Sequence, residues 1–420
     1  MGKRKIARRA LALLLCAVFL SGAAADVPIR SLTADYAAET VLFGEAVCPT
    51  LLPGGEDGMV QVRWLSRSDE PVWIHYGPDD GTGRLPEEHS RVSAESRRTT
   101  KLSTFRVWLH WAEIPAGDGT TLYGLAPEGE EPAVLYPVRR SDGGAFRVIM
   151  SSDSHVANYK QARLFEETME LAMERGEADL FFHGGDLAEN ARVAPYILTH
   201  SAPVTRSVPM AVVCGNHDRS AILYDYFEMP HLDKKSGDYW FIQGNVLFVG
   251  LNVDMRNWQL HADYIRQTVP AHREGSDWVV VAVHYSTMGF GSHVHDRRVQ
   301  NLRFAIAPAI SETDVDLVIS GHDHEYNRSW LIGPEDAAPD SDGDALVKRE
   351  GEALYVCLPT AVGTKFYTRV KEPFFPVAKG ALKNERGYVI ADFTPESITI
   401  EARRVEDGVL ADRFTLSKAA

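Results

Sequence analysis

Cysteine is scarce in this 420-residue sequence, which contains only four. Cys16 lies in an N-terminal segment described below, so Cys48, Cys214 and Cys357 remain for the folded part of the chain. An odd number at wide spacing does not form a disulfide framework, and two of the three lie in strand-like apolar runs. We therefore expect buried free thiols rather than a disulfide-stapled fold.

The apolar run at residues 10–20 is too short to span a bilayer comfortably. Basic residues precede it and small residues follow at 21–25, an order typical of a cleaved secretory signal. We predict that residues 1–25 are a signal peptide, that the protein is exported to a periplasm, a cell surface or the medium, and that no transmembrane anchor remains. A twin-arginine signal at Arg8 and Arg9 and a lipidated Cys16 are the alternatives.

Positive charge is in deficit. The chain has 44 lysines and arginines against 58 acidic residues, and 39 basic residues remain without the predicted signal peptide. Such an excess of negative charge repels polyanions, which argues against a nucleic-acid-binding protein held by phosphate contacts. A small phosphorylated substrate drawn to a local metal charge is compatible with it. The 45% hydrophobic and 24% charged residues exclude a disordered chain.

Residues 26–144 lack helical periodicity and resemble a separate β domain. Short strand patterns with turn residues between them lie at residues 60–65, 72–76, 105–111 and 121–125. This even spacing favours a sandwich. His75 and His110 alternate with aromatic residues, and we interpret both as structural histidines rather than ligands. Residues 139–144 are the predicted linker.

The second domain, residues 145–420, alternates strands with helices. Apolar residues at helical spacing, followed by Gly176, predict a helix over residues 159–175 between two strands, which implies parallel pairing. We also expect a hairpin over 239–251, a helix over 258–269, a surface loop or insertion over 333–350 and an antiparallel ending over 387–402.

Five apolar strand patterns in this domain each end in polar side chains. These are Asp153 with His155; Asp186; Asn216 with His217 and Asp218; His284; and His322 with His324. In open α/β sheets, ligands bind beyond the carboxyl ends of the strands. We therefore expect these side chains to converge on one site.

The convergent set mixes imidazoles with carboxylates, which suits Fe, Mn or Zn, whereas an all-oxygen set would suit Mg or Ca. Its seven members are Asp153, His155, Asp186, Asn216, His284, His322 and His324. Seven ligands are too many for one such ion and suit two divalent or trivalent ions with a shared carboxylate. The alternative, five unrelated structural strand ends, gives no reason for the pattern.

The ordered series Asp-x-His, Gly-Asp, Gly-Asn-His-Asp, a lone His and Gly-His-x-His spans residues 153–324. It resembles the motif series of the calcineurin-like metallophosphoesterase superfamily. Residues 226–230, 238–246 and 321–328 are similar to bacterial relatives of the purple acid phosphatases. The resemblance implies an α/β (α+β) fold, a two-layered β-sandwich core flanked by helices, preceded by an all-β fibronectin III-like sandwich at residues 26–144.

Two positions depart from the purple acid phosphatase pattern. Glu189 stands where those enzymes have the tyrosine ligand behind their colour, and His155 stands where they have glycine. His155 would then fill the coordination place that the tyrosine leaves. The resemblance therefore implies a generic dinuclear centre without the tyrosinate-to-iron colour.

Carried over residue by residue, the resemblance implies that Asp153, His155, Asp186 and His324 hold one ion. It implies that Asp186, as a bridge, Asn216, His284 and His322 hold the other. A water between the ions would attack phosphorus in line. His217 would contact the phosphate and protonate the leaving oxygen, with Asp218 orienting it.

The loop at residues 289–298 has two interpretations. It is either a wall of the substrate pocket, with His293 reaching the phosphate side beside Asn216 and His217, or a solvated basic loop. The leading hypothesis for the chain is an exported, metal-dependent phosphoric ester hydrolase that favours phosphomonoesters. A phosphodiesterase or nucleotidase with the same centre is the alternative. A third hypothesis is that the chain is not an enzyme but a non-catalytic surface binding protein. The sequence does not predict the oligomeric state.

Overall fold

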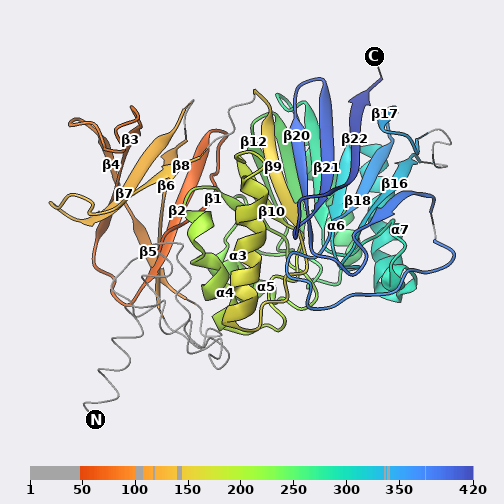
Figure 1. The fold of residues 1–420 in the computed structure, drawn as a ribbon, viewed down its shortest axis with the longest axis horizontal. Coiled ribbons are helices and arrows are strands. Elements are labelled where there is room, and N and C mark those ends of the chain that lie inside the picture. The colour runs from red at the N-terminus through yellow and green to blue at the C-terminus, as the bar shows by residue number, and fades with distance from the viewer. Residues whose placement is uncertain are drawn as a thin grey trace, which may run out of the picture.

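The structure is a computed structural model of the chain. It describes residues 48–99, 107–116, 119–139, 144–334, 337, 341–373 and 375–419. The predicted signal peptide and most of the predicted linker lie outside the described residues. Among those that are described, an all-strand N-terminal part lies at one end of the long axis and two larger sheets with helices lie at the other (Figure 1).

Two four-stranded antiparallel sheets form the N-terminal part. The first has the order β1 (Thr50–Pro53), β2 (Met59–Ser66), β6 (Trp108–Pro115), β5 (Glu95–Arg98). The second has the order β4 (Ser90–Ser93), β3 (Val72–Pro78), β7 (Thr121–Pro127), β8 (Leu135–Val138). Side chains from both sheets, Val62 and Trp64 from one and Ile74 and Tyr123 from the other, share one core. The strands predicted at 60–65, 72–76 and 121–125 are confirmed, and the fibronectin III-like assignment stays a prediction.

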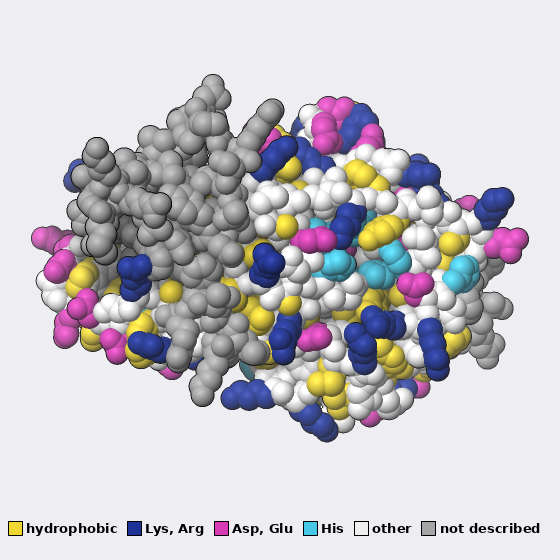
Figure 2. All heavy atoms as spheres, turned by 90° about the horizontal axis from the view of Figure 1, so that it is seen from below, with side chains coloured by type: hydrophobic (Ala, Val, Ile, Leu, Met, Phe, Trp, Pro, Cys, Tyr) yellow, Lys and Arg dark blue, Asp and Glu magenta, His cyan; other side chains and the backbone are white. Residues whose placement is uncertain are grey.

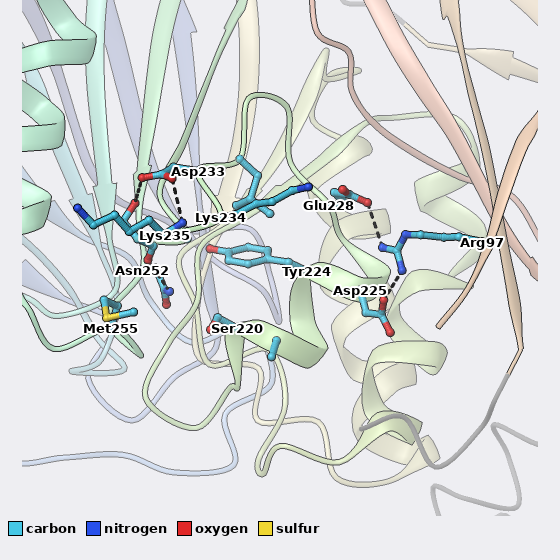
Figure 3. Close-up of a pocket in the computed structure, with 14 residues that line it drawn as sticks. Arg97, Ser220, Tyr224, Asp225, Glu228, Asp233, Lys234, Lys235, Asn252 and Met255 are labelled. Atoms are coloured by element: carbon cyan, nitrogen blue, oxygen red, sulfur yellow. Dashed lines mark hydrogen bonds and ion pairs between the residues drawn. The ribbon is translucent and has the colours of Figure 1, made fainter. Parts of the chain in front are cut away.

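Arginines join this part to the rest of the chain. Arg63 of β2 is fully buried and lies 3.2 Å from Glu228, while Arg97 of β5 pairs with Asp225 at 2.5 Å and with Glu228 at 3.1 Å. Burial lowers the pKa of Arg63 to about 10, so it stays charged at neutral pH. Figure 3 shows the Arg97 pairs beside a cavity of about 420 Å³ that also touches Tyr224. None of the seven predicted metal ligands lines this cavity.

Two seven-stranded mixed sheets form the core of the second part. The first has the order β11 (Met210–Val212), β10 (Leu180–His183), β9 (Phe146–Ser151), β20 (Gly387–Phe393), β21 (Ser397–Arg404), β22 (Leu410–Lys418), β17 (Ala345–Lys348). The second has the order β12 (Tyr239–Gln243), β13 (Val246–Leu251), β14 (Trp278–Val283), β15 (Leu317–Ser320), β18 (Ala353–Cys357), β16 (Tyr326–Ile332), β19 (Val377–Ala381). Phe182 of β10 stacks on Phe248 of β13 with 5.7 Å between ring centroids, so the sheets pack face to face.

The strands that precede the predicted ligands are parallel. In the first sheet β9, β10 and β11 run in one direction, and in the second β13, β14, β15 and β18 do. Their carboxyl ends therefore lie at one edge of each sheet, and a parallel bridge between Ser152 and Thr360 joins the two edges. This mixed α/β arrangement agrees with the expected core.

Helices cover the sheets. They are α3 (Tyr159–Met173), α4 (Val193–His200), α5 (Ser220–Tyr226), α6 (Trp258–His272), α7 (Arg297–Glu312) and the short 3-10 turns η2 (Pro203–Arg206) and η3 (Ser292–His295). The predicted helix at 159–175 is confirmed as α3. The side chain of Asn158 accepts a hydrogen bond from the Gln161 backbone and caps its start, and Gly176, at φ +147°, follows its end.

Other predicted elements have mixed outcomes. The hairpin is confirmed as β12 and β13, with Gly244 at φ +58° in its turn, and α6 extends past the predicted end through Pro270. The surface loop or insertion predicted over 333–350 contains the short strand β17, which pairs with β22. Cys214 and Cys357 are buried free thiols, as expected, whereas Cys48 is half-buried. No helix in the described part of the chain is long and apolar enough to cross a membrane.

His261 of α6 carries a buried charge. Its Nδ1 lies 2.8 Å from Asp238 Oδ2, and its Nε2 lies 2.8 Å from the Met255 carbonyl oxygen. Because a carboxylate and a carbonyl both accept hydrogen bonds, both ring nitrogens carry protons. Burial lowers the pKa of His261, but the hydrogen bond to Asp238, the charge of Asp238 and the hydrogen bond to Met255 together raise it more, so the net pKa lies above the usual value.

The His261 pair predicts a pH-dependent contribution to stability. A histidine whose pKa rises on folding stabilises fully below its unfolded pKa of about 6.5 and loses this contribution as the pH rises through the folded pKa. We expect His261→Ala to cost about 3 kcal/mol in urea unfolding at pH 6 and clearly less at pH 9. His231→Ala, at an exposed histidine, is the control. An equal cost at both pH values contradicts the charged pair.

Candidate metal centre

The loops at the carboxyl ends of the strands have unusual backbone angles. Left-handed φ values occur at Asp153 (50°), His155 (44°), Asp186 (52°), His322 (74°) and His324 (59°). Non-glycine residues rarely adopt this region, each costs about 1–3 kcal/mol, and such residues cluster at functional sites. Cross-loop hydrogen bonds hold this backbone in place, including that from the His322 amide to Asp153 Oδ2 at 2.9 Å. Five of the seven predicted ligands are therefore held in costly conformations.

One group of ligands consists of Asp153, His155 and His324, all buried. Nε2 of His324 lies 3.0 Å from Nε2 of His155 and 3.2 Å from Oδ1 of Asp153. Nδ1 of His324 donates to the Lys365 carbonyl oxygen at 2.8 Å, so in the neutral ring Nε2 carries a lone pair. In the neutral rings, two nitrogen lone pairs and a carboxylate oxygen therefore face one another, and a metal cation would bind all three.

A second group consists of Asp186, His284 and His322. Nε2 of His284 lies 3.2 Å from Asp186 Oδ2, and its Nδ1 donates to the Gly184 carbonyl oxygen at 2.9 Å. The same Asp186 oxygen lies 3.6 Å from Nε2 of His155 in the first group. Asp186 therefore lies between the two groups, where the resemblance expects a bridging ligand.

The buried polar atoms of the centre fit metal ions. Asp153 Oδ1 and His284 Nε2 are buried and have no hydrogen-bond partner. Burial raises the pKa of Asp153 and Asp186, but the neighbouring histidines lower it more, so both carboxyls are ionised. Burial lowers the pKa of His155 to about 4, so its ring is neutral. Two carboxylates beside neutral imidazoles form a donor set for borderline divalent ions.

His284 and His324 are the exceptions among these rings, because their pKa values lie above the usual value rather than below it. Burial lowers the pKa of His284, but Asp186 and then Asp153 raise it more, to about 10. The His284 ring therefore carries a proton when no metal is bound. Since a ligating nitrogen must be deprotonated, metal uptake displaces this proton.

His217 lies beside both groups. Its ring centroid is 4.6 Å from that of His155, and its backbone amide donates to Asp186 Oδ1 at 2.8 Å. Its Nδ1 donates to the Glu189 carbonyl oxygen at 2.7 Å, which leaves Nε2 for a substrate. Asn216, one residue earlier, is exposed, and its side chain makes no hydrogen bond or ion pair within the described residues.

The expectation that Asp218 orients His217 is wrong. The buried Asp218 carboxylate accepts hydrogen bonds from the backbone amides of Leu187, Ala188 and Gly215 and from the Tyr196 hydroxyl, at 2.9 to 3.2 Å. Burial, with the negative charge of Asp186, raises its pKa to about 6. Asp218 thus makes no hydrogen bond to the His217 ring, and the Glu189 carbonyl oxygen holds that ring instead.

His293 reaches the second group from the loop that precedes α7. Its ring centroid is 4.3 Å from that of His322, and its Nδ1 lies 3.1 Å from the buried Asp323. Buried Arg303 donates to the Val294 carbonyl oxygen and holds this loop. The interpretation of a freely solvated loop is therefore wrong for His293. Figure 2 shows histidine side chains gathered on one face, with lysine or arginine side chains nearby.

The loop after β18 contributes residues that sequence reasoning missed. The Tyr367 ring lies 4.4 Å from that of His293 and 4.7 Å from that of His324, between centroids. Lys365 Nζ lies 2.7 Å from Glu189 Oε1, and the other Glu189 oxygen lies 2.8 Å from Nδ1 of His155. No motif marks Lys365 or Tyr367, because they lie in an irregular loop.

The Glu189 contact predicts an effect on metal affinity. The carboxylate faces the ring nitrogen of His155 that does not point at the ligand group, and such outer contacts are worth about 10–100-fold in metal affinity. We expect Glu189→Gln to weaken zinc binding by about that factor in competition with a chelator. Lys365→Met, which leaves the carboxylate beside His155, is the control and should weaken it less. Equal affinities in wild type and Glu189→Gln contradict the role.

Comparisons with known proteins agree with this geometry. A purple acid phosphatase, PPD1 from yellow lupin (Lupinus luteus), matches with a TM-score of 0.72 and 17% identity over 89% of this chain and 74% of that chain. PhoD matches with a TM-score of 0.56 and 12% identity over 88% of this chain and 89% of that chain. At these identities the matches show a shared fold. No curated protein matches the sequence. Residues 146–326, which hold all seven predicted ligands, match the model of the calcineurin-like phosphoesterase family.

Proposed function

We propose that the protein is an exported phosphoric ester hydrolase that depends on two metal ions and favours phosphomonoesters. The observation that carries the proposal is the position of Asp186, whose Oδ2 lies 3.2 Å from His284 and 3.6 Å from His155 and so faces both ligand groups. A carboxylate shared between two ions is the common feature of two-metal hydrolytic sites. The phosphoesterase family match over residues 146–326 supports the same class of reaction.

In the proposed assignment, Asp153, His155, Asp186 and His324 hold one ion, and Asp186, Asn216, His284 and His322 hold the other. When bound, two such ions supply an activated water and neutralise charge on the phosphoryl oxygens. Asn216 is exposed and directly precedes His217, whose backbone amide donates to Asp186. Fe, Mn and Zn all suit this donor set.

His217 is the proposed general acid. Its Nδ1 keeps a proton in the hydrogen bond to the Glu189 carbonyl oxygen, so the proton that leaves the imidazolium is the one on Nε2. The backbone bond to Asp186 fixes the ring relative to the ligands. His293 makes a hydrogen bond with Asp323, and its ring lies beside that of His322. From this position His293 is proposed to contact the phosphate.

Two chromogenic esters test the function. The metal-stripped protein is reloaded separately with Mn, Fe and Zn, and hydrolysis of p-nitrophenyl phosphate and bis-p-nitrophenyl phosphate is measured. We expect faster turnover of the monoester. Faster turnover of the diester would instead support the phosphodiesterase or nucleotidase alternative. Binding of two ions without cleavage of either ester would favour the non-catalytic alternative.

We also propose that residues 1–25 are removed on export and that residues 26–144 form a fibronectin III-like domain ahead of a catalytic domain at 145–420. The two N-terminal sheets with their shared core support the second part of this proposal. N-terminal sequencing of the protein from the cells that make it should begin at Asp26. Recovery of the intact N-terminus would contradict the cleavage.

A further inference from the structure

A cluster of metal-binding side chains lies in the N-terminal sheets, outside the centre described above. His75 of β3 is buried, His89 lies just before β4, and Glu131 lies in the turn between β7 and β8. Nδ1 of His75 lies 2.8 Å from Nε2 of His89, and Glu131 Oε2 lies 3.8 Å and 3.7 Å from these two nitrogens. We propose that His75, His89 and Glu131 form a mononuclear binding site for a borderline divalent cation such as Zn²⁺.

The hydrogen bonds of His89 fix its lone pair. Its Nδ1 lies 3.0 Å from the Pro86 carbonyl oxygen, which only accepts, so Nδ1 carries the proton. The neutral ring therefore presents its Nε2 lone pair to His75. Burial lowers the pKa of His75, which favours a neutral ring there too. A simple hydrogen bond between the two rings would leave the Glu131 carboxylate without a function near them, whereas a cation uses all three groups.

The distances resemble those of the centre in the second domain. There, facing histidine nitrogens lie 3.0 Å apart and histidine nitrogens lie 3.2 to 3.9 Å from carboxylate oxygens. Tetrahedral zinc with Zn–N bonds of about 2.0–2.1 Å separates two ligand nitrogens by about 3.3 Å. His75 and His89 therefore need to open by only about half an ångström. Glu131, 76% exposed, is placed to close onto the ion.

The donor set selects the ion. Two imidazoles and one carboxylate suit Zn²⁺, Cu²⁺ or Ni²⁺ and disfavour Mg²⁺ and Ca²⁺, which prefer all-oxygen sites. Three protein ligands leave a fourth position for water. Because the ligands come from β3, the approach to β4 and the β7–β8 turn, a bound ion would cross-link the second N-terminal sheet. This proposed site departs from our interpretation of His75 as a purely structural histidine. His110 fits that interpretation, because its Nε2 lies 2.8 Å from the Ser66 hydroxyl and its ring stacks on Trp64.

Zinc stoichiometry in the full-length mature chain tests the site. Wild type, His89→Ala and Glu131→Gln are stripped with a chelator, dialysed against micromolar free Zn²⁺ and analysed for zinc per chain. We expect wild type to retain one zinc more than His89→Ala. Loss of one ligand should cost at least the 10–100-fold in affinity that outer contacts cost, so Glu131→Gln should bind this zinc at least tenfold more weakly.

The same zinc measurement in Asp186→Asn protein separates this site from the proposed catalytic centre. The zinc bound by His75, His89 and Glu131 should remain in Asp186→Asn and should be lost in the Asp186→Asn, His89→Ala double variant. Electron paramagnetic resonance of bound Cu²⁺ in that background should show coupling to ring nitrogens that His89→Ala reduces. His231→Ala, at an exposed histidine outside every cluster found in the described residues, should match wild type. Since Glu131 is exposed, Glu131→Gln should fold normally. Equal zinc content and affinity in wild type, His89→Ala and Glu131→Gln would overturn the site.

Discussion

An Asp186→Asn substitution should lower kcat/KM for p-nitrophenyl phosphate by at least about a thousandfold and remove metal from the proposed two-ion centre. The reason is geometric, because one carboxylate faces His284 at 3.2 Å and His155 at 3.6 Å and so contributes to both proposed ion sites. The amide keeps the shape and an oxygen for the His217 backbone bond, but loses the negative charge. Elemental analysis and ester hydrolysis on the same preparation measure both effects.

The metal-free Asp186→Asn protein provides a second readout. Asp186 is the largest contributor that raises the pKa of His284, so its neutralisation should lower that pKa and remove the proton that metal uptake displaces in the wild type. Proton release during zinc titration at pH 8 should therefore fall. Asp407→Asn, at an exposed carboxylate paired with Arg404, is the matched control and should leave activity and metal content unchanged. Full activity in Asp186→Asn would contradict a bridging role.

The strand ends of the second domain were predictable because two local rules act together. An apolar run that stops in Asp or His marks where a buried strand meets the surface, and parallel strands place such ends at one edge. Asp153 and His322 illustrate this, since they are far apart in sequence yet joined by a hydrogen bond of 2.9 Å from the His322 amide. The left-handed backbone at these residues was not predictable, because the surrounding tertiary contacts impose it.

The errors have a different physical origin. Asp218 follows His217 directly, but neighbouring side chains on a turn point in different directions, and three backbone amides and a tyrosine hydroxyl outcompete His217 for the carboxylate. Strand β17, inside the predicted surface loop or insertion, was missed because it is short and its partner β22 comes from a distant part of the chain. Lys365 contacts the site with its backbone carbonyl oxygen, which accepts a hydrogen bond from His324. Because every residue type has this atom, the sequence could not indicate the contact.

The remaining large effect concerns the proton given to the leaving group. If His217 protonates the leaving oxygen, His217→Ala should slow hydrolysis of phenyl phosphate by about 10²–10⁴-fold. It should slow hydrolysis of p-nitrophenyl phosphate much less, because p-nitrophenolate is a stable anion that leaves without a proton. The comparison uses kcat for both esters with the same metal loaded, so a change in metal content affects both equally.

His293→Ala is the matched control for this experiment. Both histidines lie beside predicted metal ligands, but the proposal gives His293 only a phosphate contact, so its loss should slow both esters by similar factors. A general acid is distinguished from a binding residue by this dependence on the leaving group rather than by the size of the loss. If His217→Ala slows the two esters equally, His217 binds phosphate without donating a proton, and the leaving oxygen must take its proton from another group or from water. The Glu189 carbonyl oxygen holds the proton on Nδ1 of His217, so only the proton on Nε2 can pass to the leaving group. A side chain with a nitrogen only at the Nδ1 position therefore cannot restore the proton transfer. The difference between the two esters depends on Nε2.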